Sequence, residues 1–304
     1  MGAGLAVEFT RAGRVEWVGH LSYTRAGDFI LTAPGRMDWV VAIPSYKRPE
    51  GVVKKSLHTL LAGGVPASKI TVFVSDDPKD EEAKYRALIK PDMAKIVVGK
   101  RGLINQRQFI IDYYPKNKLI MFLDDDIAGL KRLKGDHVVD VKDVKGVINE
   151  GFKLMNEHGA NLWGIYPTAN PFYMTDKVTT NLKYIIGAFF GIRNTKNPVY
   201  RLKYSDTQED KERTIRYWQK DGVVVRLNYI APKTTYFAPG GLDNPTRKAD
   251  TKKHTDELLH AFPTYFKQVY KPARGIYDLT FVRQPKTESK TQTRKVKKRR
   301  TETD

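Results

Sequence analysis

The 304-residue sequence contains no cysteine, which excludes disulfide bonds and zinc sites built on thiolates. It also has no run approaching the ~18 consecutive apolar residues of a membrane-spanning helix. Its first residues lack the charged segment and following apolar run of a secretory signal. We therefore expect a soluble protein of the cytoplasm that binds no membrane.

Acidic residues are scarce relative to basic ones. The chain has 34 Asp and Glu against 53 Lys and Arg, which gives a formal net charge of +19. Residues 286–304 hold eight basic and three acidic residues, so this tail carries +5 and leaves +14 on residues 1–285. A body this basic favours a polyanionic partner, with nucleic acid first and an anionic membrane surface second. The alternative is a basic soluble protein without such a partner.

Three regions differ in composition. Residues 1–37 alternate loosely between apolar and polar and are broken by Gly and Pro, which predicts a small N-terminal β appendage. Residues 38–285 contain the regular apolar periodicity of the main domain. Residues 286–304 have almost no apolar content, so we expect a disordered basic tail.

The main domain alternates strand-like and helix-like segments, which predicts an α/β fold with a mostly parallel sheet flanked by helices. Strands are expected at 39–43, 70–74, 95–98, 119–123, 161–166, 184–192 and 223–229. Helices are expected at 48–61, 80–89, 103–114, 141–157 and 209–220. In such sheets ligands bind beyond the carboxyl ends of the strands. Polar clusters follow three of these ends, at 44–48, 75–77 and 124–126, so we expect them to converge on one edge.

Three adjacent carboxylates, Asp124, Asp125 and Asp126, come directly after the apolar run 119–123. They repel each other and are costly to desolvate, and a bound Mg²⁺ or Mn²⁺ would remove both costs. Because side chains alternate along an extended chain, Asp124 and Asp126 can point the same way while Asp125 points oppositely. The alternative is a strand that ends in a solvated acidic turn.

With this carboxylate run, the opening Val41-Ala42-Ile43-Pro44-Ser45-Tyr46-Lys47-Arg48-Pro49 and the segment Gly187-Ala188-Phe189-Phe190-Gly191, the chain resembles GT-A fold nucleotide-sugar glycosyltransferases. The resemblance covers roughly residues 38–245. Within that fold the chain is most similar to the TET/JBP-associated glycosyltransferases, which act on hydroxymethylated pyrimidines in DNA, such as hydroxymethylcytosine, chiefly in bacteriophages. The resemblance implies a Rossmann-like GT-A sheet, a UDP-sugar donor and a Mn²⁺ or Mg²⁺ cofactor. It further implies a monomer that acts on double-stranded DNA with a modified base, in the host cytoplasm if phage-encoded.

Donor-binding roles follow from the resemblance and from the chemistry at the strand ends. The candidates are Pro44, Ser45, Tyr46, Arg48, Asp76, Asp77, Lys100, Arg101, Asn105, Arg107, Asp124 and Asp125. Asp76 or Asp77 is placed to accept a hydrogen bond from a uracil-like base, with a turn cap before Pro78 as the alternative. Lys100 and Arg101 precede a helix N-terminus, and both features suit phosphate. For Arg107 the alternative is a solvated helix face.

The resemblance also implies metal ligands and a general base. Asp124 and Asp126 are the expected ligands, with His254 as a third, although a lone His among lysines is often simply solvated. If the reaction inverts the anomeric centre, the acceptor hydroxyl needs a base. Asp210 is our first candidate and Glu209 the second, and the alternative is ordinary acidic charge at a helix start.

Further residues are candidates for acceptor contacts. Aromatic and polar residues in apparent loops can stack on a sugar or an extruded base: Tyr166, Asn170, Phe172, Tyr173, Tyr236 and Phe237. Basic residues of the last third can contact DNA phosphates: Arg247, Lys248, Lys252, Lys253, Lys267, Lys271 and Arg274. Rival interpretations are a glycan, lipid-carrier or protein acceptor, a non-catalytic nucleic-acid-binding module, and a metal-dependent nuclease or nucleotidyltransferase.

Overall fold

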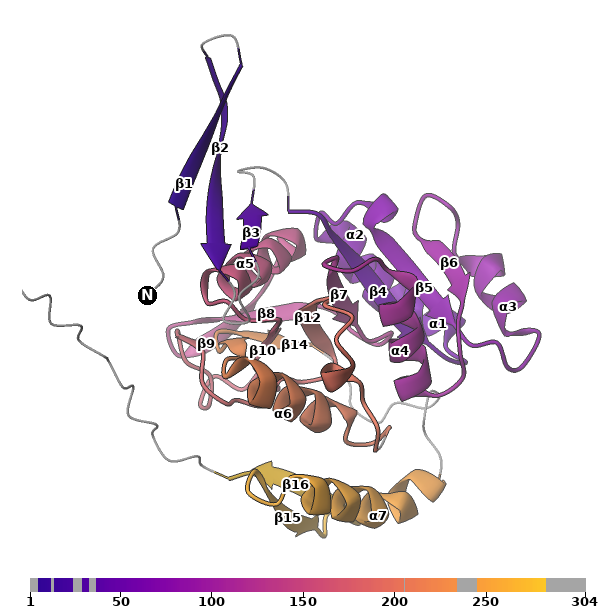
Figure 1. Cartoon of the computed structure of the whole chain (residues 1–304). Coiled ribbons are helices and arrows are strands. Elements are labelled where there is room, and N and C mark those ends of the chain that lie inside the picture. Colours follow the sequence, from indigo (N-terminus) through magenta and orange to yellow (C-terminus); the bar gives the residue numbers. More distant parts are fainter. Residues whose placement is uncertain are drawn as a thin grey trace, which may run out of the picture.

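The structure, a computed structural model, describes residues 5–11, 14–23, 29–32, 37–204, 206–233 and 245–282, with side chains described for 37–204, 206–233 and 250–282. A mixed sheet of eight strands forms the centre of this part of the chain (Figure 1). In spatial order its strands are β11 (Val178–Thr179), β13 (Val225–Leu227), β10 (Leu162–Ile165), β12 (Phe189–Arg193), β7 (Leu119–Leu123), β4 (Trp39–Ser45), β5 (Ile70–Val74) and β6 (Lys95–Val98). All but β11 and β12 run in one direction. The predicted α/β class with a mostly parallel sheet is confirmed.

Helices cover both faces of the sheet. One face carries α1 (Pro49–Val52), the π-helical turn Val53–Leu57 and α2 (His58–Ala62), together with α3 (Glu81–Leu88) and α5 (Val144–Glu157). The other face carries α4 (Leu103–Tyr113) and α6 (Glu209–Asp221). Short 3-10 turns at Ala67–Lys69 and Pro198–Tyr200 complete the helical elements of these two layers.

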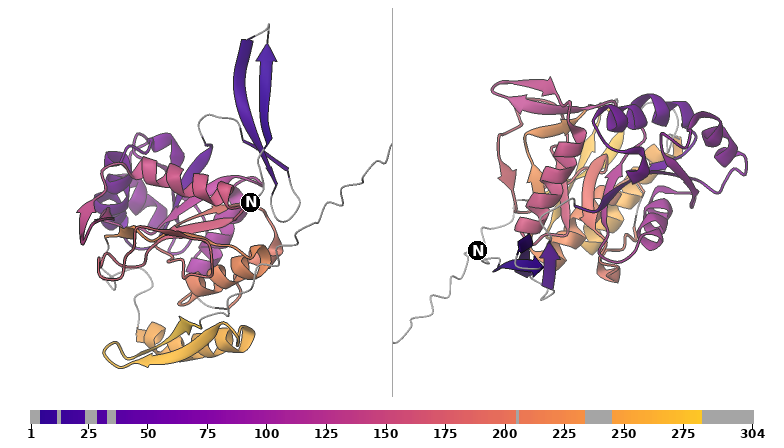
Figure 2. Two further views of the ribbon diagram at one scale, coloured as in Figure 1. Left: turned by 90° about the vertical axis from the view of Figure 1, so that its left-hand side faces the viewer. Right: turned by 90° about the horizontal axis from the view of Figure 1, so that it is seen from above.

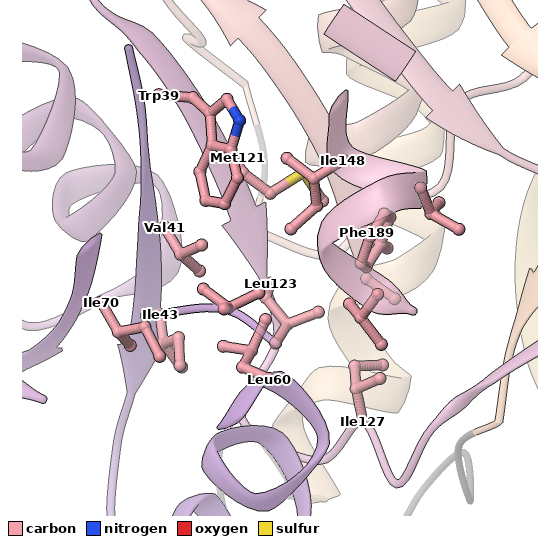
Figure 3. Packing of buried hydrophobic residues seen from close by; sticks show 14 of the residues in the cluster. Trp39, Val41, Ile43, Leu60, Ile70, Met121, Leu123, Ile127, Ile148 and Phe189 are labelled. Atoms are coloured by element: carbon pink, nitrogen blue, oxygen red, sulfur yellow. The ribbon is translucent and has the colours of Figure 1, made fainter. Parts of the chain in front are cut away.

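The alternation of side chains along β4 and β7 separates two cores. Val41, Ile43, Met121 and Leu123 face α2 and α5, where they pack with residues such as Ile148 (Figure 3). The residues between them in the sequence face the opposite side, toward α4 and α6. Burial of each large apolar side chain contributes roughly 1.5–3 kcal/mol. The strand ends are therefore fixed by packing on both faces.

Two predicted strands are shorter than expected. The predicted strand 184–192 begins only at Phe189, because residues 184–186 form no regular structure and residues 187–188 form a turn, in which the Gly187 carbonyl accepts a hydrogen bond from Arg107. The predicted strand 223–229 is reduced to β13, and a separate short strand, β14 (Ile230–Pro232), follows it. β14 pairs with an unpredicted hairpin, β8 (Leu130–Lys134) and β9 (His137–Asp140), in a sheet of order β14-β8-β9.

Separate elements precede and follow the main sheet. The three antiparallel strands β1 (Leu5–Arg11), β2 (Arg14–Tyr23) and β3 (Phe29–Thr32) form the expected N-terminal β appendage. After the main sheet, α7 (Pro245–Ala261) and the hairpin β15 (Phe266–Lys271) and β16 (Ile276–Phe281) were not predicted. They pack against α6 through Ile215 and Leu258, and they form the orange-to-yellow layer of Figures 1 and 2. The predicted disordered tail, 286–304, lies outside the described residues.

Candidate active site

Polar side chains from neighbouring strands meet at the carboxyl edge of the sheet, as the sequence predicted. Arg48, just after β4, places Nη1 3.1 Å from Oδ1 of Asp125 and 3.6 Å from Oδ2 of Asp126, both just after β7. Asp76, after β5, lies 2.9 Å from Nζ of Lys100, after β6. Ion pairs thus join the ends of β4 and β7 and those of β5 and β6, which brings the predicted clusters to one edge.

The β5–β6 side of this edge combines opposite charges with an aromatic ring. Asp76 Oδ1 accepts a hydrogen bond from the backbone N–H of Arg101 at 3.0 Å, and the Arg101 side chain reaches Asp77 Oδ2 at 2.5 Å. The Arg101 guanidinium also lies 5.9 Å from the centre of the Tyr46 ring. The charged groups of Asp77, Lys100 and Arg101 are more than half exposed. A ligand can therefore reach this side of the edge.

Asp125 is an internal anchor rather than an open ligand group. Its carboxylate is buried and accepts hydrogen bonds from Ser45 Oγ at 2.6 Å and Arg48 Nη1 at 3.1 Å. Burial raises its pKa, while Ser45 and Arg48 oppose the change. Tyr85 completes this network through contacts with Ser45 Oγ and the Arg48 backbone N–H. The network holds the segment after β4 in place, and it engages the side chains of Ser45 and Asp125 that the sequence had suggested for donor binding.

A buried chain of charges links Asp124 to the start of α6. Arg107 of α4 places Nη2 3.1 Å from Asp124 Oδ1 and Nη1 2.5 Å from Glu209 Oε1. Arg213 lies 2.5 Å from the other Glu209 oxygen, and its guanidinium is 3.5 Å from the centre of the Phe190 ring. The Arg107, Glu209 and Arg213 side chains are only 4–5% exposed. Arg107 is therefore a buried connector and not a solvated helix residue.

Gly187 leaves the space in which this chain of charges lies. A Cβ atom at this position would come within 2.6 Å of Glu209 Oε1 and 3.4 Å of the Arg107 guanidinium nitrogens. The Gly187 carbonyl also accepts a hydrogen bond from Arg107 Nη2 at 3.1 Å. The glycine-spaced segment that the sequence analysis singled out therefore shapes the site beside Asp124.

The Asp124 carboxylate combines burial with access. Burial raises its pKa to about 7; Arg107 opposes this, and Asp126 and Glu209 raise the pKa further. The side chain nevertheless remains 36% exposed. A cation placed beside it would favour the ionised form and so relieve the cost of burying the charge.

Asp210 and Glu209 are adjacent in sequence but differ in environment. Glu209 is held by two guanidinium groups, and burial raises its pKa. Asp210 is half-buried and accepts a hydrogen bond from the Tyr184 hydroxyl. Burial raises the pKa of Tyr184 well above its usual value, so the phenol stays protonated and donates. Asp210 therefore fits the role of general base better than Glu209 does.

The N-terminus of α4 is partly occupied by a residue that the sequence did not single out. Asp206 Oδ1 accepts a hydrogen bond from the Ile104 backbone N–H at 2.7 Å, which satisfies one of the donors left free at a helix start. Asn105 Nδ2 donates to the Arg101 carbonyl at 3.1 Å. A separation of 102 residues between Asp206 and Ile104 left no local sequence signal for this contact.

Asp124 and Asp126 could hold a metal ion whose remaining coordination positions are filled by a bound ligand and water. Within the described residues no group of three or more His, Asp or Glu side chains could hold a metal ion. His254 is therefore not grouped with the two aspartates, and its Nδ1 lies 3.0 Å from Thr207 Oγ1. Mg²⁺ is commonly bound by one or two carboxylates that are completed by water and substrate phosphates. Asp124 and Asp126 match that donor set.

The remaining candidates fall into three groups. Phe172 and Tyr173 are 84% and 60% exposed and pack edge to face, while Asn170 Oδ1 accepts the Phe172 N–H at 3.1 Å. The basic residues of the C-terminal layer with described side chains are Lys252, Lys253, Lys267, Lys271 and Arg274. Tyr236, Phe237, Arg247 and Lys248 fall where no side chain is described.

No helix of the described residues is long and apolar enough to cross a membrane.

No known protein family matches the chain, and no characterised protein matches it in sequence. Solved structures with a related arrangement include residues 1–349 of Staphylococcus aureus TarS, with 14% identity and a TM-score of 0.43 over 64% of this chain and 60% of that one. Mycobacterium tuberculosis glucosyl-3-phosphoglycerate synthase with Mg²⁺ and UDP has 11% identity and a TM-score of 0.44, covering 81% and 87% of the two chains. Rubrobacter xylanophilus mannosyl-3-phosphoglycerate synthase has 10% identity and a TM-score of 0.46, covering 82% and 85%. Similarities this distant leave the function to be argued from the site.

Proposed function

We propose that this protein is a metal-dependent glycosyltransferase of the GT-A type. It would transfer a sugar from a nucleoside diphosphate sugar, with UDP as the first candidate nucleotide, to a hydroxymethylated pyrimidine in double-stranded DNA. The observation that carries the proposal is the continuous chain from Asp124 through Arg107 to Glu209, with Asp210 next to it. This chain begins at a carboxylate suited to a metal and ends at the residue that precedes Asp210, the carboxylate suited to proton transfer.

Donor binding would use the carboxyl edge. Asp124 and Asp126 would hold Mn²⁺ or Mg²⁺ together with the two donor phosphates, and the ion would neutralise charge on the departing diphosphate. Lys100 and Arg101 stand at the same edge and add positive charge for the phosphates. Tyr46 would stack on the nucleotide base, and Asp76 or Asp77 would accept a hydrogen bond from it.

Asp210 would accept the proton of the acceptor hydroxyl as that oxygen bonds to the sugar's anomeric carbon. The bond between this carbon and the donor phosphate oxygen breaks, and the diphosphate departs with the electron pair. Tyr184 donates a hydrogen bond to Asp210 and so orients its carboxylate. Such a base contributes about 10²–10⁴-fold to the rate.

The acceptor proposal rests on charge and on exposed aromatic groups. Residues 1–285 carry +14, which suits a phosphate backbone. Phe172 and Tyr173 present large exposed rings after β10, one of the strands of the central sheet. Aromatic rings of this kind stack on bases, and an enzyme that modifies a base in a duplex must first extrude it.

Release of nucleoside diphosphate tests this proposal. A panel of nucleotide sugars would be incubated with the protein, Mn²⁺ and either hydroxymethylated or unmodified duplex DNA. We expect rapid release from one donor only when the DNA is hydroxymethylated. Release that is faster with a glycan or protein acceptor, and indifferent to the modified DNA, would overturn the DNA assignment. Absence of donor binding and turnover under all conditions would favour the non-catalytic nucleic-acid-binding alternative.

A further inference from the structure

Arg226, in the middle of β13, is a buried arginine. It is 9% exposed, and its guanidinium lies 5.0 Å from the centre of the half-buried Tyr166 ring. Nε donates to Asn228 Oδ1 at 2.7 Å, and Nη1 donates to the Tyr184 carbonyl at 3.1 Å. Nη2 makes no hydrogen bond within the described residues, and the same holds for the Tyr166 hydroxyl. Each of these two neighbouring side chains therefore retains a donor without a hydrogen-bond partner among the described residues.

No carboxylate of the described residues forms an ion pair with Arg226, unlike the other buried arginines near the site. Arg107 and Arg213 pair with Glu209, and the half-buried Arg216 pairs with Glu212. A buried cation without a counter-charge is costly, and burial lowers the pKa of Arg226 to about 10. Arg193 also lacks a carboxylate partner in the described part of the chain. It ends β12, which runs opposite to its neighbours, so it lies at the far edge of the sheet.

The position of Arg226 separates it from the donor phosphates. β13 is three strands from β7 in the order β13-β10-β12-β7. At a spacing of about 4.8 Å between strands, β13 lies roughly 14 Å from β7, the strand that Asp124 and Asp126 follow. Arg226 is nevertheless close to the proposed base, because Tyr184 contacts Arg226 through its carbonyl and Asp210 through its hydroxyl. An anion at Arg226 would thus lie near Asp210, the residue proposed to take the proton of the acceptor hydroxyl.

We propose that Arg226 and Tyr166 form an anion subsite that binds a phosphate of the acceptor, next to the nucleotide that receives the sugar. This inference rests on the proposed function and names the acceptor group that this part of the site recognises. Arginine binds phosphate strongly through charge-assisted hydrogen bonds, and a phosphate would supply the missing counter-charge. Asn228 fixes the guanidinium and is itself held by Thr179 Oγ1 at 3.2 Å and the Lys177 carbonyl at 2.9 Å.

The first test uses the wild-type protein and needs no variant. Transfer would be measured to hydroxymethyldeoxycytidine, to its 5′-monophosphate and to a trinucleotide with the modified base in the centre. We expect the phosphorylated acceptors to have kcat/KM about 10- to 100-fold above the nucleoside, the worth of a charge-assisted contact. Inorganic phosphate should compete with the acceptor and not with the nucleotide sugar. Equal use of nucleoside and nucleotides would overturn the inference.

The second test compares Arg226→Gln with Arg193→Gln, which removes a half-buried guanidinium without a carboxylate partner in the described residues from the far edge of the sheet. Binding of inorganic phosphate to protein loaded with UDP and Mn²⁺ would be measured by calorimetry. We expect Arg226→Gln to weaken phosphate binding at least about tenfold and leave UDP affinity unchanged, with Arg193→Gln resembling wild type. Arg226→Lys keeps the positive charge but loses the paired N–H groups of the guanidinium. Its phosphate affinity should therefore lie between those of the wild type and Arg226→Gln.

Phosphate affinity that is unchanged in Arg226→Gln, or lost equally in Arg193→Gln, would refute the subsite. These readouts separate the subsite from the proposed function. Failure of UDP binding in the wild type would count against the glycosyltransferase assignment. Normal UDP binding together with phosphate binding that ignores Arg226 would count against the subsite alone.

Discussion

Three adjacent aspartates after β7 have three different environments. Asp124 pairs with Arg107 and stays partly exposed, whereas Asp125 is buried against Ser45 and Arg48. Asp126 lies 3.6 Å from Arg48, with 19% of its side chain exposed. Three identical side chains therefore differ in burial and in hydrogen bonding because their neighbouring residues differ.

Asp126→Asn and Asp125→Asn should separate metal binding from folding. We expect Asp126→Asn to abolish Mn²⁺-dependent transfer while its unfolding midpoint stays near wild type, because a coordinating charge is lost at a partly exposed position. Asp125→Asn should lower the free energy of unfolding by about 1–3 kcal/mol, since it weakens a buried network. Transfer assays with and without EDTA, together with urea unfolding, check both. Activity of Asp126→Asn that resists EDTA would rule out the metal site.

Asp210→Asn and Glu209→Gln should affect different properties, the first turnover and the second stability. Asp210→Asn should fold normally and lose about 10²–10⁴-fold in turnover, with donor affinity unchanged. Glu209→Gln should destabilise the protein by about 3–5 kcal/mol, because it leaves two buried guanidinium groups without their shared counter-charge. Single-turnover rates and chemical denaturation distinguish the two. Wild-type turnover in Asp210→Asn would remove that residue from the mechanism.

At the scale of elements, α6 joins the site to the C-terminal layer. Its first turn carries Glu209 and Asp210, and Lys211 forms an ion pair with Asp278 of β16. Ile215 on the same helix packs with Leu258 of α7. Displacement of the C-terminal layer would therefore disturb the start of α6, where the proposed base lies.

Asp278 gives this contact a pH dependence. Burial alone would raise its pKa, but Lys211 and Lys271 outweigh burial and hold it below the usual value of 3.8. A depressed pKa contributes stability above pH 4, and this stability is lost as the pH falls through the folded-state pKa. Asp278→Asn should therefore cost about 1–3 kcal/mol at pH 7, and this cost should shrink as the pH falls through the folded-state pKa of Asp278.

Urea unfolding of the Asp278→Asn protein from pH 2 to 8 measures this dependence. Glu157→Gln is the matched control, because it breaks an exposed pair with Lys153 and should change stability little at any pH. A cost for Asp278→Asn that does not vary with pH would show that the ion pairs of Asp278 are not its source.

Elements with strong periodicity were predictable from sequence. The apolar runs of β4, β5 and β7 and the polar residues that follow them identified the sheet and its functional edge. The hairpin β8–β9 and helix α7 were missed because charged and polar residues interrupt the apolar positions of their sequences. The pairings of Arg107 and Arg226 could not be predicted either, because each depends on contacts between residues far apart in the chain.

At the scale of the whole molecule, charge is the property that points to nucleic acid. Because 14 of the 19 net positive charges lie on residues 1–285, duplex binding should fall steeply with salt even without residues 286–304. Fluorescence anisotropy from about 50 to 200 mM salt would compare the full chain with the truncated one. We expect both to show steep slopes, with the truncated chain binding somewhat more weakly. Binding that is insensitive to salt would favour a glycan or protein acceptor.

The mass of the nucleosides recovered from treated DNA tests the central claim most directly. Hydroxymethylated duplex would be incubated with the protein, Mn²⁺ and the donor identified by diphosphate release, then digested and analysed by mass spectrometry. The account predicts a new nucleoside heavier than hydroxymethylcytosine by one sugar residue, formed by the wild type and absent with Asp126→Asn. Unaltered nucleosides, with the sugar instead recovered on a glycan or a protein, would contradict it.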